Sequence, residues 1–282
     1  MIYNWNYEEP DAKVAEEAAE LAAAARIHPA LGRLLHERGM RTPAEVTQFF
    51  RPQLTTLHDP FLMNDMDKAV DRLNEAMGKK ERILVYGDYD VDGCTAVALV
   101  YKFLRQYYSH IDYYIPDRYD EGYGISHKSI EMAAESGVKL VIVLDCGIKA
   151  VEEIAYAKSL GVDFIICDHH VPDDVLPEAA AILNPKRHDN HYPYTELSGC
   201  GVGFKFMQAF ALNNGIEFNK LTSLLDLCAV SIASDIVPVM GENRILAYHG
   251  LRCLNSNPSI GLRAIVEVCG LTERELTMND IV

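Results

Sequence analysis

Two hydrophobic patterns alternate along the middle of the chain. Short continuous apolar runs are typical of strands buried on both faces of a parallel sheet, and stretches with apolar residues at helical spacing separate them. The runs predict strands at 83–87, 112–115, 140–144, 164–167 and 180–183. The stretches between them predict helices at 94–108, 126–136 and 150–160. Repeated strand–helix units with short connections imply an α/β fold with a doubly wound, mainly parallel sheet and helices on both faces.

The segments on either side of this region have helical patterns. Before it, helices are predicted at 11–26, at 28–39, from Thr42-Pro43 onward and at 67–80. After Pro185, helices are predicted at 203–213, 220–233, 244–254 and 261–269. We therefore expect a helical N-terminal extension over 1–80 and a main domain over 81–282, in which a mostly helical segment follows the sheet. The apolar end of the sequence leads us to expect that the natural chain continues beyond it.

Acidic residues follow three of the predicted strands at the points where the strands end. These residues are Asp88, Asp90 and Asp92 after the first strand, Asp145 after the third, and Asp168-His169-His170 after the fourth. In a parallel sheet the ligand site lies outside the carboxyl ends of the strands, so five carboxylates and two imidazoles converge on one edge. Divalent cations are the natural compensation for so much negative charge. The pattern therefore predicts a site for metal ions.

A fourth acidic position, Asp235, ends an apolar run of helical spacing just before Val237-Pro238. A negative charge at a helix C-terminus is mildly unfavourable, which favours a cation partner. The string 88–93 also resembles the start of an EF-hand calcium loop, but that loop needs a glutamate where this chain has Leu99. Asp145 taken alone is equally compatible with a structural role.

Composition narrows the class of protein. The chain has 282 residues and a formal net charge of −15, whereas nucleic-acid binding normally leaves a basic footprint. A nucleic-acid substrate would therefore be held through metal ions and a local basic strip. No apolar run reaches the roughly 18–20 residues of a membrane span, and the N-terminus lacks the pattern of a signal peptide. The seven cysteines form no CxxC pair, which indicates a reduced, cytoplasmic protein with neither a disulfide framework nor a zinc cluster.

The acidic motifs resemble those of the DHH phosphoesterase superfamily. Its four motifs correspond to the string 88–93, to Asp145, to Asp168-His169-His170 and to Asp235. Within the superfamily the chain is similar to the RecJ-type exonucleases, and the resemblance extends over nearly the whole chain. The further strings that carry it are Arg38-Gly39 with Thr42-Pro43, Asp59-Pro60-Phe61, Ile115-Pro116-Asp117-Arg118, Glu121-Gly122-Tyr123-Gly124, Leu183-Asn184-Pro185 and the segment 198–205.

The resemblance implies a site for two divalent cations, Mn²⁺ or Mg²⁺. One ion would be held by Asp90 and Asp145, with Asp88 in support. The other would be held by Asp92, Asp145, His169 and Asp235, with Asp145 as the bridge. Asp168 completes the catalytic set. His170 would hydrogen-bond the scissile phosphate, because adjacent histidines usually point to different sides.

Three further positions are candidates for phosphate binding because they offer a positive charge or backbone N–H groups. Arg118 and Lys205 are cationic, although each is equally compatible with an ordinary salt bridge. The glycine-rich turn 199–203, which includes Gly201, leads into a predicted helix and would present backbone N–H groups to phosphate.

The implied function is metal-dependent degradation of single-stranded DNA from its 5′ end, in repair and recombination. RecJ-type proteins carry a further domain with a Gly-Gly-His motif and an OB-fold that binds single strands, and these partner domains lie outside this sequence. Other DHH enzymes cleave pyrophosphate, cyclic dinucleotides or very short RNAs, and a non-catalytic replication scaffold is a different class of alternative. A Rossmann-type nucleotide site is disfavoured, because the GxGxxG turn is absent. Replacing Asp145 with alanine is predicted to remove both metals and all phosphodiesterase activity.

Overall fold

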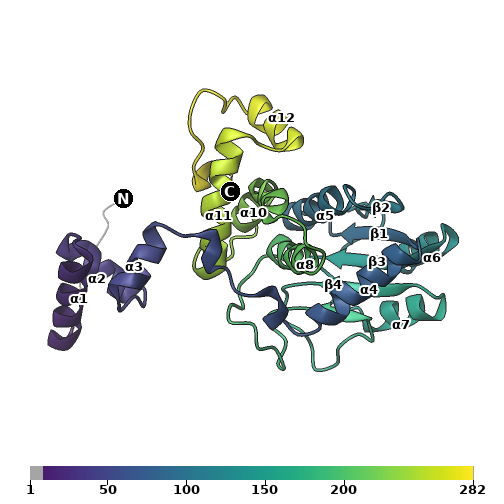
Figure 1. Ribbon diagram of the computed structural model, residues 1–282, viewed down its shortest axis with the longest axis horizontal. Coiled ribbons are helices and arrows are strands. Elements are labelled where there is room, and N and C mark those ends of the chain that lie inside the picture. Colours follow the sequence, from purple (N-terminus) through teal and green to yellow (C-terminus); the bar gives the residue numbers. More distant parts are fainter. Residues whose placement is uncertain (1–8, 282) are drawn as a thin grey trace. The chain divides into compact units, whose positions relative to one another are not determined.

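The computed structural model describes residues 9–281, which form two compact units. One unit ends at Thr56 and the other begins at Leu57 (Figure 1). Among the described residues, no helix is long and apolar enough to cross a membrane.

The N-terminal unit is a small helical assembly. Its helices are α1 (Ala12–Ala25), α2 (Pro29–Glu37) and α3 (Pro43–Phe50), followed by the 3₁₀ turn η1 (Leu54–Thr56). A capping box fixes the start of α3, because Thr42 accepts a hydrogen bond from the backbone N–H of Glu45 while the Glu45 side chain accepts one from Thr42. The three helices predicted before residue 56 are therefore confirmed.

The second unit is built on a five-stranded sheet in which all the pairings are parallel. The strands are β1 (Arg82–Gly87), β2 (Ile111–Tyr114), β3 (Val138–Leu144), β4 (Asp163–Cys167) and β5 (Ala181–Leu183). Their spatial order is β2-β1-β3-β4-β5. The chain therefore leaves β1 in one direction for β2 and later returns to its other side with β3, which makes the β1/β3 boundary the topological switch point.

Helices cover both faces of this sheet, which confirms the predicted fold class (Figure 1). Helices α6 (His127–Glu135) and α7 (Val151–Ser159) pack on one face, where Leu84, Tyr86 and alternate residues of β3 and β4 join a buried cluster. The other alternate positions, such as Ile83 and Val85, are buried on the opposite face. Helices α4 (Met66–Gly78), α5 (Val91–Leu104) and α8 (Gly199–Asn213) contact one another or the sheet on that side.

The remaining helices follow the sheet, as predicted. Helix α10 (Leu225–Ser234) packs on α5 and α8, and α11 (Gly241–Ser256) packs on α10. The other elements are the 3₁₀ turns η2 (Pro60–Leu62) and η3 (Met278–Asp280) and the helices α9 (Phe218–Thr222) and α12 (Ile260–Val268).

Three details differ from the prediction. Helices α5 and α8 each begin three or four residues earlier than predicted, because Asp90 and Ser198 act as N-caps and accept hydrogen bonds from Gly93 and Gly201. The predicted helix 220–233 is split into α9 and α10. Helix α4 belongs to the unit with the sheet rather than to a separate extension, because its apolar stripe is buried there.

Candidate metal centre

The topology brings the acidic clusters to one edge of the sheet. Asp88 follows β1, Asp145 follows β3 and Asp168 follows β4, and these three strands are neighbours. The Asp88 and Asp145 positions flank the switch point, where the connecting segments diverge and leave a crevice. Asp88 and Asp168, which lie 80 positions apart in the sequence, thus come to the same edge of the sheet.

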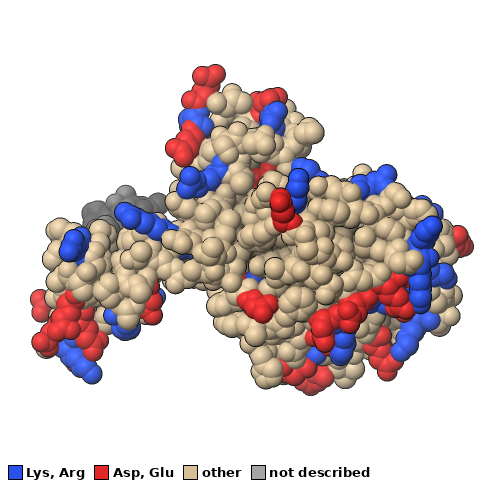
Figure 2. Space-filling model, viewed as in Figure 1, with Lys and Arg blue, Asp and Glu red and all other residues tan. Residues whose placement is uncertain are grey.

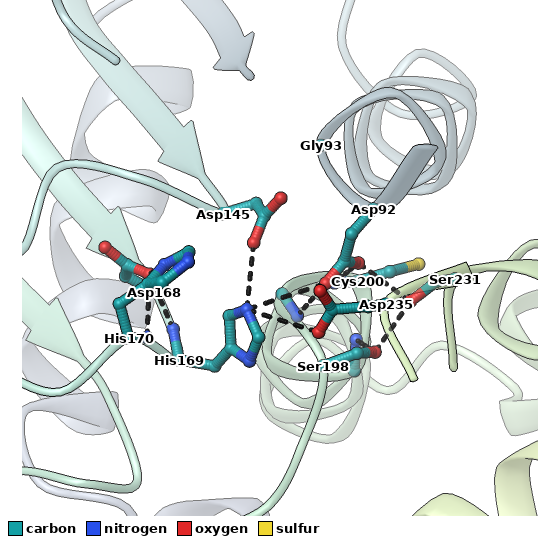
Figure 3. A network of polar contacts seen from close by, with 12 residues as sticks. Asp92, Gly93, Asp145, Asp168, His169, His170, Ser198, Cys200, Ser231 and Asp235 are labelled. Atoms are coloured by element: carbon teal, nitrogen blue, oxygen red, sulfur yellow. Dashed lines mark hydrogen bonds and ion pairs between the residues drawn. The ribbon is translucent and has the colours of Figure 1, made fainter. Parts of the chain in front are cut away.

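His169 lies between three carboxylates (Figure 3). Its Nε2 atom is 3.1 Å from Asp145 Oδ1, 3.6 Å from Asp235 Oδ2 and 3.8 Å from Asp92 Oδ2. Ligand atoms of Asp92, His169 and Asp235 lie within 4.8 Å of one another, and so do those of Asp145, His169 and His170. Both groups share His169 and have the donor types that Mn²⁺ accepts.

The backbone at Asp145 adopts an unusual conformation that directs its side chain into the site. Its φ is +61°, a left-handed value that aspartate and asparagine tolerate better than most residues. Its N–H donates to the carbonyl of Cys167, which continues the β3–β4 ladder up to the turn. The side chain is then enclosed by Gly199, where an added Cβ would lie only 2.5 Å from Asp145 Oδ1. Glycine at 199 is therefore a steric requirement of the site.

Asp92 is held at the N-terminus of α8. One of its oxygens accepts the N–H of Gly199 at 2.7 Å, and the other accepts the N–H of Cys200 at 2.8 Å and the hydroxyl of Ser231 at 2.7 Å. A carboxylate at a helix N-terminus is favoured by the free N–H groups and by the helix dipole. These bonds fix the Asp92 side chain, which is 1% exposed, beside His169.

The same bonds correct one prediction from the sequence. The turn 199–203 was expected to offer its N–H groups to phosphate, but the N–H groups of Gly199 and Cys200 bind Asp92. That of Gly201 binds the hydroxyl of Ser198 at 3.1 Å. Gly201 is consequently not placed to bind substrate through its backbone, and the anion that this helix end receives is a side chain of the protein itself.

Asp168 orders the segment that carries both histidines. Its carboxylate accepts the N–H groups of Ile148, His169 and His170, and it lies 2.7 Å from His170 Nδ1. Burial alone would raise the pKa of Asp168, but the hydrogen bond to His170 and the other contacts lower it. The hydrogen bond to Asp168 in turn raises the pKa of His170. This pair favours a protonated His170 whose Nε2–H is left for another acceptor.

Asp88 and Asp90 lie at the end of β1, outside the two groups of ligand atoms found around His169 in the described residues. Asp88 is fully buried, and neither of its oxygens has a hydrogen-bond partner among these residues. Asp90 is exposed and caps α5. Gly93 allows the end of β1 to approach this helix, because an added Cβ would lie 2.5 Å from the Asp88 carbonyl oxygen.

The arrangement of polar atoms fits bound cations. Within the described part of the chain, both oxygens of Asp88, Oδ1 of Asp145 and both ring nitrogens of His169 are buried and lack a well-formed hydrogen bond. Burial, followed by the charges of Asp92 and Asp90, raises the pKa of Asp145 to about 11. Burial also raises the pKa values of Asp88 and Asp92. Buried polar atoms normally find partners, so the orphaned set indicates ligands from outside the chain.

The raised pKa values predict an unusual dependence of stability on pH when no metal is present. A carboxyl group whose pKa is higher in the folded state stabilises the fold below its unfolded pKa, and this contribution is lost as pH rises through the folded value. For Asp145 the window extends from about 3.8 to about 11. In EDTA, the free energy of unfolding should therefore fall between pH 5 and pH 8, by up to about 1.4 kcal/mol per pH unit for each proton.

Denaturant unfolding at several pH values checks this prediction, with Asp145→Asn as the variant that removes one titrating group. The wild type should lose more stability with pH than the variant, and Mn²⁺ should protect the wild type increasingly as pH rises. Parallel pH dependences of the two proteins in EDTA would contradict the assignment.

Arg118 stands near the site at the end of a row of aromatic rings. Its guanidinium carbon lies 5.1 Å from the centre of the Tyr89 ring, and the centroids of Tyr89 and Tyr123 are 6.3 Å apart. Tyr123 in turn stands edge-to-face against His170 at 6.3 Å. Arg118 is exposed, so its proposed contact with phosphate is sterically open. No role was predicted from the sequence for either tyrosine, and only the resemblance of the string 121–124 pointed to Tyr123.

Lys205 is not brought to the site. Its ammonium is fully buried and donates to the carbonyl of His58 at 2.7 Å and to Glu242 Oε1 at 3.2 Å. The carboxylate of Glu242 is also bonded by the hydroxyl of Tyr192. The prediction that Lys205 contacts phosphate is therefore replaced by a structural role, since a buried charge needs its partner.

The fold and the site together define the class of protein. The sequence model described as the DHH family, N-terminal domain, matches residues 82–232, which run from β1 into α10. The chain belongs to the DHH family, and the resemblance predicted from its motifs is confirmed. The match contains every predicted metal ligand except Asp235, which lies just beyond it.

The individual relatives are RecJ exonucleases. The single-stranded-DNA-specific exonuclease RecJ of Bacillus subtilis (strain 168) is 37% identical over 266 residues, which cover 94% of this chain and 33% of the relative. That of Escherichia coli (strain K12) is 34% identical over 277 residues and covers 94% and 47%. The chain thus spans between a third and a half of the length of these curated relatives.

Two solved structures are similar to this one. The crystal structure of RecJ in complex with Mn²⁺ from Thermus thermophilus has a TM-score of 0.78 and 26% identity, over 96% of this chain and 37% of that chain. The crystal structure of exonuclease RecJ bound to manganese has a TM-score of 0.69 and 29% identity, over 78% and 55%.

Proposed function

We propose that this chain is the catalytic part of a metal-dependent phosphodiesterase that degrades single-stranded DNA from the 5′ end. The observation that carries the proposal is the cluster of Asp92, Asp145, His169 and Asp235. The polar atoms of these side chains converge at the carboxyl ends of the strands. Support for the substrate comes from relatives named single-stranded-DNA-specific exonucleases. Support for the metals comes from similar structures that hold Mn²⁺.

The positions of the side chains support the ligand set of the first cation, and the family resemblance supports that of the second. Asp92, Asp145, His169 and Asp235 would hold one divalent cation, Mn²⁺ or Mg²⁺. Asp145 would share a second cation with Asp88 and Asp90, the other carboxylates of this edge. When bound, two such ions supply Lewis acidity to the phosphate and make water nucleophilic at neutral pH.

The protein's own groups have distinct tasks in this proposal. His170 donates its Nε2–H to an oxygen of the scissile phosphate, because Asp168 occupies its Nδ1 atom and favours the protonated ring. Its side chain is 45% exposed, which leaves it open to a substrate. Arg118 adds a second positive charge beyond the aromatic row. Tyr123 fixes the turn after β3 by donating a hydrogen bond to the carbonyl of Asp145 at 3.3 Å.

The surface charge is consistent with contact through the site rather than through a broad basic face. Figure 2 shows acidic and basic side chains interspersed over the face in view, and the described residues of that face form no broad basic area. Together with the net charge of −15, this supports binding of the phosphate backbone mainly by cations and a few local side chains.

Digestion of single-stranded DNA tests the proposal. DNA labelled at either the 5′ or the 3′ end is incubated with the protein and Mn²⁺, beside Asp145→Asn as control. Release of the 5′ label alone, dependent on metal and lost in the control, is the expected result. Cleavage of a dinucleotide or of pyrophosphate without cleavage of DNA would assign the chain to another branch of the family. If none of these three substrates is cleaved, the proposal that this chain is catalytic is contradicted.

Replacing His170 with alanine is expected to separate metal binding from turnover. The variant should retain Mn²⁺, since the other ligands around His169 remain, but it should cleave DNA about 10²-fold more slowly, as when one donor to developing charge is removed. Calorimetric titration with Mn²⁺ and single-turnover cleavage measure the two effects. A variant that loses its metal would instead show that His170 is a ligand.

A further inference from the structure

A cavity of about 290 Å³ adjoins the metal centre and is not used by the proposed mechanism. Asp168 and His170 form one of its walls, so this wall is shared with the site. A group that enters the cavity would therefore remain close to a phosphate that contacts His170.

The other walls are apolar, and hydrogen bonding or packing against the core fixes their positions. They are formed by Tyr123, Ile125, Ile148 and Ala150. Ile148 is 1% exposed, and its N–H is bonded to Asp168 Oδ2 at 2.9 Å. Ile125 and Ala150 pack against the buried cluster under α6 and α7. A flat ring that slides between these side chains would meet a preformed apolar surface.

Two charged side chains, Lys149 and Glu153, complete the lining of the cavity, and both can form hydrogen bonds with the polar edge of a nucleobase. Lys149 pairs with Asp173 at 3.0 Å, while Glu153 is half-buried in the first turn of α7. A carboxylate at such a position accepts hydrogen bonds from the amino group of a base, as Asp and Glu do with cytosine. The lining thus combines an aromatic wall, aliphatic walls and a hydrogen-bonding rim.

We propose that this cavity receives the unpaired nucleobase of a nucleotide that flanks the scissile phosphate. The proposal rests on the proposed function of the neighbouring site. The volume of about 290 Å³ is close to the lower limit for small-molecule sites, roughly 300–1,000 Å³, and suits a single base. A base that must leave its stack to enter would make the site selective for single strands.

Binding of small ligands tests the proposal without relying on turnover. In the presence of Mn²⁺, calorimetry measures the affinity of the protein for dCMP and for 2-deoxyribose 5-phosphate, which lacks the base. The wild type should bind dCMP about tenfold more tightly, as expected for one stacked base. Ala150→Phe fills the cavity and should reduce this ratio to about one, with little change for the sugar phosphate.

A second pair of variants keeps the test decisive if the larger side chain disturbs folding. Glu153→Ala should weaken dCMP binding by about threefold to tenfold, on the scale of one lost hydrogen bond. Glu152→Ala, an exposed neighbour on the same helical turn that does not line the cavity, should leave it unchanged. Equal affinities of the wild type for the two ligands, or equal behaviour of the two glutamate variants, would overturn the proposal.

The outcomes also separate this inference from the proposed function. DNA cleavage combined with base-independent binding would refute the base cavity alone. Base-dependent binding that is lost in Ala150→Phe, in a protein that leaves labelled DNA intact, would support the cavity and refute the exonuclease assignment.

Discussion

Replacing Asp145 with asparagine is expected to reduce DNA cleavage by about 10⁴-fold, the scale of losing several kcal/mol of metal-derived stabilisation. Asp145 faces His169 at 3.1 Å and is the carboxylate proposed to contact both cations. Asparagine is a better substitution than alanine here, because it tolerates the left-handed backbone at this position and keeps the size of the side chain. A loss of activity in Asp145→Asn would then be caused by the loss of the negative charge and not by a change in the conformation of the turn after β3.

The same variant should change stability in opposite directions with and without metal. In EDTA it should be more stable than the wild type by about 1–3 kcal/mol, because a buried and poorly compensated acidic group is removed. With saturating Mn²⁺ the order should reverse, since only the wild type gains free energy from bound metal.

Cleavage rates, Mn²⁺ titrations and denaturant unfolding of both proteins measure these effects. Asp174→Asn, a change of the same kind in an exposed loop, is the matched control and should behave like the wild type. If the Asp145→Asn protein cleaves DNA at the wild-type rate, the assignment of two metal ions to this site is wrong.

The strands and the convergence of the acidic clusters were predictable because they depend on rules that act along the chain. Buried strands of a parallel sheet give continuous apolar runs, and their carboxyl ends must meet at one edge. Asp88, Asp145 and Asp168 each follow such a run, so their approximate positions required no knowledge of tertiary contacts. Asp235 was predicted less directly, from its place at a helix end and from the resemblance.

The partners of individual side chains were not predictable, because they depend on contacts between distant segments. Asp92 binds the N–H of Gly199, 107 positions away, and so occupies the helix end that was expected to bind phosphate. Lys205 was a candidate for phosphate binding only because of its positive charge, but folding places it against Glu242. In both cases the local pattern identified the right chemistry, and the tertiary structure supplied a partner from within the protein.

Gly199→Ala is expected to disable the site although the residue contributes no metal ligand. An added Cβ would lie 2.5 Å from Oδ1 and 2.6 Å from Cβ of Asp145, which is closer than real Cβ contacts allow. Either Asp145 turns away from His169 or the start of α8 moves and carries Asp92 with it. We expect cleavage to fall by about 10³-fold and Mn²⁺ to bind more weakly. Either change moves a predicted metal ligand out of position, and a shift of about 1 Å is enough to lower the rate strongly.

Gly201→Ala, two residues further along the same helix, is the matched control. There an added Cβ would meet Ser198 and Leu197 at 3.3 Å or more, and alanine favours a helix over glycine by about 1 kcal/mol. Ser198 must move by a few tenths of an ångström to admit the methyl group, so this variant should keep its activity and stay within about 1 kcal/mol of the wild-type stability. Equal loss of activity in both variants would instead indicate that any side chain on this turn interferes with the substrate.

A double substitution distinguishes the steric mechanism from a general loss of helix stability. If the clash with the Asp145 side chain is what destabilises Gly199→Ala, adding Asp145→Gly removes the obstacle. Glycine also accepts the left-handed backbone at 145. The double variant should then unfold at higher denaturant than Gly199→Ala while remaining inactive, a non-additive result of the kind that neighbouring residues produce. Additive losses of stability would place the effect of Gly199 elsewhere in the helix.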